Sequence, residues 1–87
     1  MDISDILKQE LQNFRPGDEI QIEHAELVHG YLFIPTASHG YLAVAHDDPF
    51  HSVAVKIADF GYIGRHAVYL EEDSEAGAFL KAIGMPV

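Results

Sequence analysis

Two short apolar segments separated by turn-forming residues constrain this chain more than any other feature. Tyr31–Ile34 and Tyr41–Val44 are rich in residues that favour β-strands. The segment between them, from Pro35 to Gly40, is rich in residues that favour a turn. The sequence therefore predicts a β-hairpin at the centre of the chain.

A four-residue loop fixes which residues face each other across this hairpin, because each strand residue then has a defined partner. The predicted pairs, from the loop outward, are Pro35 with Gly40, Phe33 with Leu42, Tyr31 with Val44 and His29 with His46. In this register Tyr31 and Tyr41 lie on opposite faces of the sheet. A slip of a single residue would exchange the two faces, so the register is a definite prediction.

Apolar residues at helical spacing predict an amphipathic helix near each end of the sequence. The first contains Ile3, Ile6, Leu7, Leu11 and Phe14 and is expected to stop at Pro16-Gly17. The second is expected from Ser74 to Ile83, with Asp73 or Ser74 as its cap and Gly84 and Pro86 as its stop. Its inward-facing residues are predicted to be Phe79, Leu80 and Ile83.

Three further segments complete the prediction of secondary structure. Ile20–Glu23 alternates apolar and polar residues like a half-buried strand and loses this phase near Ala25, where a bulge or a break is expected. Ala67–Leu70 is predicted to be a strand. Phe50–Ile57 fits a strand by its alternating valines, or a short helix because Asp48-Pro49 is a helix start. The helix is favoured.

The order of these elements predicts an α+β fold for a single domain of residues 1–87. We expect a small, mostly antiparallel sheet with the N- and C-terminal helices packed on one face, since both amphipathic helices need a sheet to cover. A domain of this size buries only about 60% of the surface that its unfolded chain exposes. A homodimer is therefore expected to supplement its stability.

The charge balance disfavours several classes of partner. Five Lys and Arg residues stand against 14 Asp and Glu residues, which gives a net charge of -9, and the basic residues are scattered singly. Such a surface repels phosphates and anionic lipids, so no direct binding of nucleic acid or membrane is expected. The absence of cysteine excludes disulfides, thiolate zinc sites and a cysteine nucleophile. With no membrane-spanning stretch and no signal-peptide pattern, a cytoplasmic location is expected.

Two short motifs carry a resemblance to a known family. The first is Thr36-Ala37-Ser38-His39-Gly40, and the second is Val68-Tyr69-Leu70-Glu71-Glu72-Asp73-Ser74-Glu75-Ala76. From about Gly30 to Ile83 the chain resembles a domain of unknown function found in phage and plasmid proteins, which combines a Thr-x-Ser-His-Gly turn with a Tyr-x-Glu-Glu-Asp-Cys-Asp segment. The chain has Ser74-Glu75 where the family has Cys-Asp, and Tyr41 where the family often has a second glycine. The resemblance implies an accessory protein of a mobile element and brings no established activity.

The residues of these motifs supply the candidate binding surface. It consists of His39, Tyr41, Glu71, Glu72 and Asp73, and its carboxylates suit a divalent cation or a basic partner. A hydrolase that pairs Ser38 or Thr36 with His39 is disfavoured, because adjacent residues of a tight turn rarely aim their side chains at each other and the context of a nucleophile elbow is missing. No catalytic residue is assigned.

Histidine is unusually frequent in the middle of the chain. Five of the six histidines lie between His24 and His51, in a segment without Lys or Arg. The candidate metal ligands there are His29, His46, Asp48 and His51. Zinc accepts imidazole and carboxylate ligands, although the spacing of these four matches no recognised motif. Protonation of the histidines near pH 6, as a switch of assembly, is a further interpretation.

The function expected from the sequence is a non-enzymatic protein-interaction module that uses no cofactor and binds a partner with a basic surface. The alternative is a small metal-binding protein, or a metal-dependent enzyme, that uses the histidines.

Overall fold

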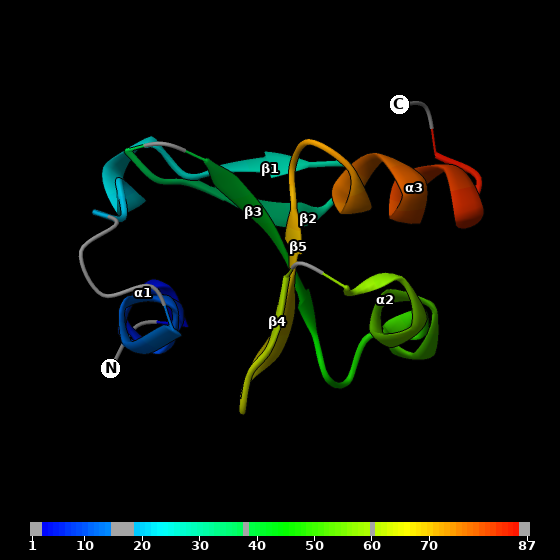
Figure 1. Cartoon of the computed structure of the whole chain (residues 1–87), viewed down its shortest axis with the longest axis horizontal. Coiled ribbons are helices and arrows are strands. Elements are labelled where there is room, and N and C mark those ends of the chain that lie inside the picture. The colour runs from blue at the N-terminus through cyan, green and yellow to red at the C-terminus, as the bar shows by residue number, and fades with distance from the viewer. Residues whose placement is uncertain (1–2, 15–18, 38, 60, 86–87) are drawn as a thin grey trace.

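One antiparallel sheet organises the protein (Figure 1). The computed structural model describes residues 3–14, 19–37, 39–59 and 61–85. Within these residues, five strands lie in the order β1-β2-β3-β5-β4. The strands are β1 (Glu26–Val28), β2 (Tyr31–Pro35), β3 (Gly40–Ala45), β4 (Tyr62–Ile63) and β5 (Ala67–Glu71). The helices are α1 (Ile3–Phe14), the 3-10 helix η1 (Ile22–His24), α2 (His51–Ile57) and α3 (Glu75–Ala82). The predicted α+β class is confirmed.

The central hairpin has the predicted register over its loop and inner strands. Pro35 pairs with Gly40 and Phe33 with Leu42, and the ladder between β2 and β3 continues to Leu32 and Ala43. Tyr31 and Tyr41 pack into opposite faces of the sheet, as predicted.

The outer end of the hairpin differs from the prediction, because the chain turns sharply before Tyr31. His29 and Gly30 have φ angles of 52° and 87° and connect β1 to β2, with Val28 paired to Tyr31. Two successive positive φ angles are the signature of a type I′ hairpin turn, for which glycine at the second position is well suited. His29 therefore lies in a turn, and its predicted pairing with His46 is wrong.

The sheet is covered on both faces, so the prediction that the terminal helices share one face is wrong. On one face, Leu7 and Leu11 of α1 pack with Tyr41 and Tyr69. On the other face, α2 and α3 contribute Ala54, Ala76, Phe79 and Leu80 to a second core with Leu42, Val44, Val68 and Leu70. Figure 1 shows α1 on one side of the sheet and α2 with α3 on the other. Each fully buried large side chain contributes about 1.5–3 kcal/mol to stability.

Both helices of the second face follow the sequence signals closely. Helix α2 confirms the helical reading of residues 50–57 but begins at His51, because Asp48 accepts a hydrogen bond from the Phe50 N–H at 2.8 Å and forms a turn before the helix. Helix α3 ends as predicted at Gly84, whose φ is 85°, with hydrogen bonds from Gly84 N–H to Lys81 C=O and from Met85 N–H to Leu80 C=O. This pattern is a Schellman motif. Ser74 is the N-cap but makes no side-chain capping hydrogen bond.

The N-terminal region contains the remaining differences. Helix α1 confirms the first predicted helix, while its predicted stop at Pro16-Gly17 lies outside the described residues. The predicted strand at Ile20–Glu23 is wrong: Ile20 forms one isolated bridge with Thr36, and the chain then enters η1 before β1. No helix in the described ranges is long and apolar enough to cross a membrane.

Candidate functional site

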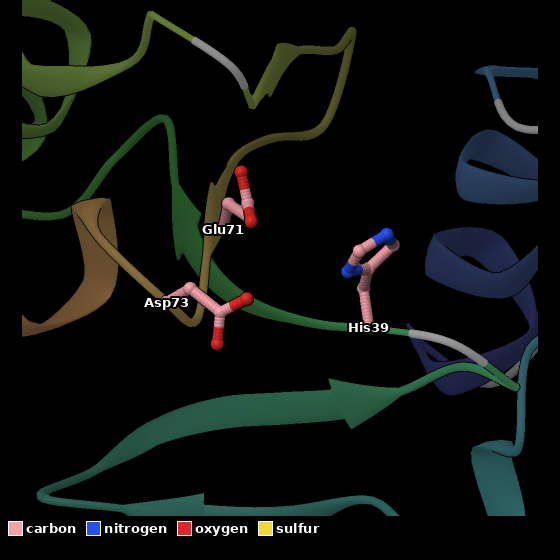
Figure 2. Close-up of side chains that lie close together, drawn as sticks. All are labelled: His39, Glu71 and Asp73. Carbon is pink, nitrogen blue, oxygen red and sulfur yellow. The ribbon is translucent and has the colours of Figure 1, made fainter.

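Three polar side chains from two segments that are far apart in the sequence converge at one end of β3, and we call them the open cluster: His39, Glu71 and Asp73 (Figure 2). One donor atom from each lies within 4.8 Å of the donor atoms of the other two. His39 and Asp73 are exposed, and Glu71 is half-buried. The sequence placed all three among the candidate binding residues, and the structure brings them together.

Strand pairing explains this convergence. Tyr41 pairs with Glu71, and the Glu72 N–H donates to the Gly40 C=O at 3.0 Å, so the same antiparallel register places His39 opposite Asp73. Side chains two residues apart in a strand point to the same face. Glu71 therefore lies on the same face as its partner Tyr41, whereas Glu72 lines a groove on the other face. Asp73 lies in the turn that follows β5, and there its carboxylate comes within 4.8 Å of the donor atoms of Glu71 and His39.

The backbone that carries His39 is held by two hydrogen bonds with Thr36. The His39 N–H donates to the Thr36 Oγ1 at 2.8 Å, and the Thr36 N–H donates to the His39 C=O at 2.8 Å. A Cβ on Gly40 would overlap the ring of Phe33 unless that ring moved, so close packing favours glycine here. The Thr and Gly of the first motif therefore shape the turn, and the His39 side chain is left exposed. Ser38 lies outside the described residues.

A second group of side chains lies at the opposite end of β3 and bonds to the turn between β4 and β5. We call it the turn clamp, and it consists of Glu10, His46 and His51. His46 Nδ1 lies 2.8 Å from His51 Nε2, and His46 Nε2 lies 2.5 Å from the Gly64 C=O. A carbonyl only accepts, so His46 Nε2 carries a proton. In the neutral His46 ring Nδ1 is then the acceptor, and His51 Nε2–H is the donor. Both ring nitrogens of His46 are thus engaged inside the protein.

Glu10 completes the turn clamp from the other face of the sheet. Its carboxylate accepts hydrogen bonds from the Arg65 N–H at 2.7 Å, the His66 N–H at 3.1 Å and the Tyr69 hydroxyl at 2.8 Å. Burial acts to raise the pKa of Glu10, but these hydrogen bonds outweigh it and hold the pKa below its ordinary value. Burial, and then the bond to Glu10, raise the pKa of Tyr69 far above its ordinary value. A Cβ on Gly64 would overlap the Glu10 carboxylate.

The four metal ligands predicted from the sequence do not form one group. His29 lies in the β1–β2 turn, and His46 and His51 bind each other. Asp48 accepts hydrogen bonds from the Phe50 N–H and from the Tyr31 hydroxyl at 3.2 Å. Burial and the nearby Asp48 raise the pKa of Tyr31. Among the described residues, three possible ligands gather at the open cluster instead.

Two of the predicted binding residues lie apart from the open cluster. Tyr41 is only 1% exposed and packs in the core under α1, so it is not a surface recognition residue. Glu72 is exposed and, with Glu26, borders an apolar groove of about 350 Å³ on the α3 face. Its other lining residues are Val28, Phe33, Leu42, Ala76, Gly77 and Leu80.

Two carboxylates with structural roles were missed by the sequence reasoning. One is Glu10, described above. The other is Glu75, which is 4% exposed and accepts hydrogen bonds from the Asp59 N–H at 2.5 Å and the Glu71 N–H at 3.2 Å. Their sequence signal is weak, because each lies on an amphipathic helix where a glutamate is ordinary. In the structure, a Cβ on Gly61 would crowd the Glu75 carboxylate, and a Cβ on Gly64 would crowd that of Glu10.

The acidic charge is not neutralised within the described part of the molecule. Lys56, Arg65 and Lys81 are exposed, and none of their side chains lies within ion-pair distance of a described carboxylate. His24 Nε2 lies 3.9 Å from a Glu23 carboxylate oxygen, a contact that is an ion pair only when His24 is protonated.

Comparison with protein-family models, with curated proteins and with solved structures found no match.

Proposed function

We propose that the protein is a non-enzymatic interaction module whose groove on the α3 face binds a basic, amphipathic segment of a protein partner. The observation that carries this proposal is the composition of the groove. Its floor is apolar, its rim bears Glu26 and Glu72, and no Lys or Arg is among its lining residues.

The size and chemistry of the groove suit side chains better than a small polar ligand. Its volume of about 350 Å³ falls in the range of protein binding pockets, which is about 300–1,000 Å³. The half-buried Val28 and Phe33 offer apolar surface. The two exposed glutamates can meet the charged ends of Lys or Arg side chains of a bound segment. The apolar contacts supply affinity, and the rim charges supply specificity and faster association.

A pair of synthetic peptides tests this proposal directly. The first carries leucines at helical spacing with lysines elsewhere, and the second replaces every lysine by glutamate. We expect the basic peptide to bind, measured by fluorescence anisotropy, with an affinity that falls as salt rises. Binding of both peptides alike, or of neither, would contradict the proposal.

Substitution of the rim carboxylates locates the binding surface. Glu26→Gln and Glu72→Gln should each lower the affinity for the basic peptide by about two- to fivefold, which is the effect expected from the loss of an exposed ion pair. Glu23→Gln is the matched control, because Glu23 is 68% exposed, carries the same charge and is not among the lining residues of the groove. An equal loss in the control would show that only net charge matters.

Three expectations from the sequence are carried forward as part of this proposal. They are a homodimer, a cytoplasmic location and an association with a phage or plasmid. The first is supported by the small size of the domain, and the last by the motif resemblance alone.

A further inference from the structure

We propose that the open cluster binds a divalent transition-metal ion of the Zn²⁺ class through one nitrogen of His39 and one carboxylate oxygen each of Glu71 and Asp73. This site differs in every residue from the histidine set that the sequence suggested. It is also separate from the peptide groove, because Glu72 lines that groove and none of the three metal ligands does.

The distances are compatible with metal binding after a small adjustment of exposed side chains. Ligands of a tetrahedral zinc ion, each about 2.0–2.2 Å from the metal, lie about 3.4 Å from one another. The donor atoms of the open cluster are already within 4.8 Å of one another. Rotation about the side-chain bonds of the exposed His39 and Asp73 can bring the donor atoms closer by the remaining distance of about 1.4 Å. Three protein ligands leave a fourth position for water.

The donor atoms are free to bind. In the described part of the structure, no hydrogen bond or ion pair involves the imidazole of His39 or the carboxylate groups of Glu71 and Asp73. By contrast, both ring nitrogens of His46 are engaged. A metal ion therefore displaces only water at the open cluster, whereas at His46 it has to break protein hydrogen bonds.

Electrostatics and backbone order both favour the binding of a divalent cation at the open cluster. Two carboxylates within 4.8 Å of each other repel, and no described Lys or Arg pairs with either of them. A divalent cation relieves that repulsion. Two of the three ligands project from hydrogen-bonded backbone, since Tyr41 pairs with Glu71 and Thr36 holds the His39 turn, and Asp73 follows directly after β5. Binding therefore orders few residues, which favours affinity.

The donor set indicates the class of metal. Magnesium and calcium prefer oxygen ligands only, whereas an imidazole nitrogen with two carboxylates suits zinc and its neighbours in the first transition row. We expect Zn²⁺ to bind with 1:1 stoichiometry and excess Mg²⁺ not to displace it.

Calorimetric titration of the untagged protein with ZnCl₂ in a chelator-free buffer tests the site. His39→Gln and Asp73→Asn should each weaken Zn²⁺ binding by about tenfold or more, since each removes one of three ligands. Glu72→Gln is the matched control: it removes the same charge from the intervening residue on the opposite face and should leave binding unchanged. His51→Gln should also leave it unchanged.

Several outcomes would overturn the proposal. These are the absence of Zn²⁺ binding, binding that survives His39→Gln, equal binding of Mg²⁺, or a loss caused by His51→Gln or Glu72→Gln. Circular dichroism verifies that each variant is folded. If Asp73→Asn does not fold, Glu71→Gln replaces it with the same expected loss. Glu26→Gln separates this proposal from the peptide groove. It changes a lining residue of the groove but none of the metal ligands, so it should leave Zn²⁺ binding unchanged.

Discussion

Each end of β3 carries a histidine, but the side chain of one is hydrogen-bonded within the protein and, among the described residues, the side chain of the other is not. His39 precedes the strand and His46 follows it, and each lies near other ionisable groups. At the His46 end, His46 and His51 are hydrogen-bonded to each other, and His46 and Glu10 are hydrogen-bonded to the backbone of the β4–β5 turn. At the His39 end, three possible ligands converge with no partner in the described structure. The comparison teaches that free donor atoms, more than the number of histidines, distinguish a candidate site from a structural contact.

The largest effect on stability is expected from Glu10→Gln, which disrupts the hydrogen bonds that hold the β4–β5 turn at the His46 end of β3. An amide offers one acceptor oxygen, and its NH₂ group then faces the N–H donors of the turn. Loss of hydrogen bonds to a charged group costs about 1–3 kcal/mol. Urea unfolding of the variant should show this loss, while Zn²⁺ affinity stays the same. A variant as stable as the wild type would mean that Glu10 does not hold the turn.

A smaller effect on stability should distinguish His46 from His39. His46→Ala leaves the Gly64 C=O and the His51 ring without a partner and should cost about 1–2 kcal/mol. His39→Ala removes an exposed side chain without a described hydrogen bond and should change stability by no more than about 0.5 kcal/mol. Unfolding measured without metal makes this comparison. Equal losses in the two variants would remove the distinction between the two ends of β3.

The pH dependence of stability should show the smallest effect. The folded pKa of Glu10 lies below its ordinary value near 4.5, so ionised Glu10 stabilises the fold above that pH, and this stabilisation is lost as pH falls through the folded pKa. The stability difference between the wild type and Glu10→Gln should therefore be largest near neutral pH and shrink below about pH 4.5. Unfolding curves across this range measure it. A difference that grows in acid would reverse the assigned sign.

Local signals in the sequence were sufficient for most of the secondary structure. Pro35 and Gly40 set the loop and hence the register of β2 with β3, and Gly84 ends α3 through its positive φ. The two-face arrangement was missed, although the continuous apolar runs of β3 and β5 indicate strands that are buried on both faces.

The candidate site depends on a contact that local patterns do not determine. His39, Glu71 and Asp73 were each recognised as candidate binding residues, but their convergence follows from the pairing of β3 with β5, which are far apart in the sequence. The four predicted metal ligands do not gather, because His29 lies in a two-residue turn with Gly30, and Asp48 is hydrogen-bonded to the Phe50 N–H and the Tyr31 hydroxyl. The anchoring role of Glu10 depends on the packing of α1 against the β4–β5 turn, which the spacing of its apolar residues does not specify.

The most direct test of the contrast between the two ends of β3 is the ¹H–¹⁵N correlation spectrum of the histidine rings during Zn²⁺ titration. We predict that the ring signals of His39 shift and saturate at one equivalent of metal, while those of His46 and His51 stay in place. Earlier or larger shifts at His46 or His51, or an unchanged His39, would contradict the account.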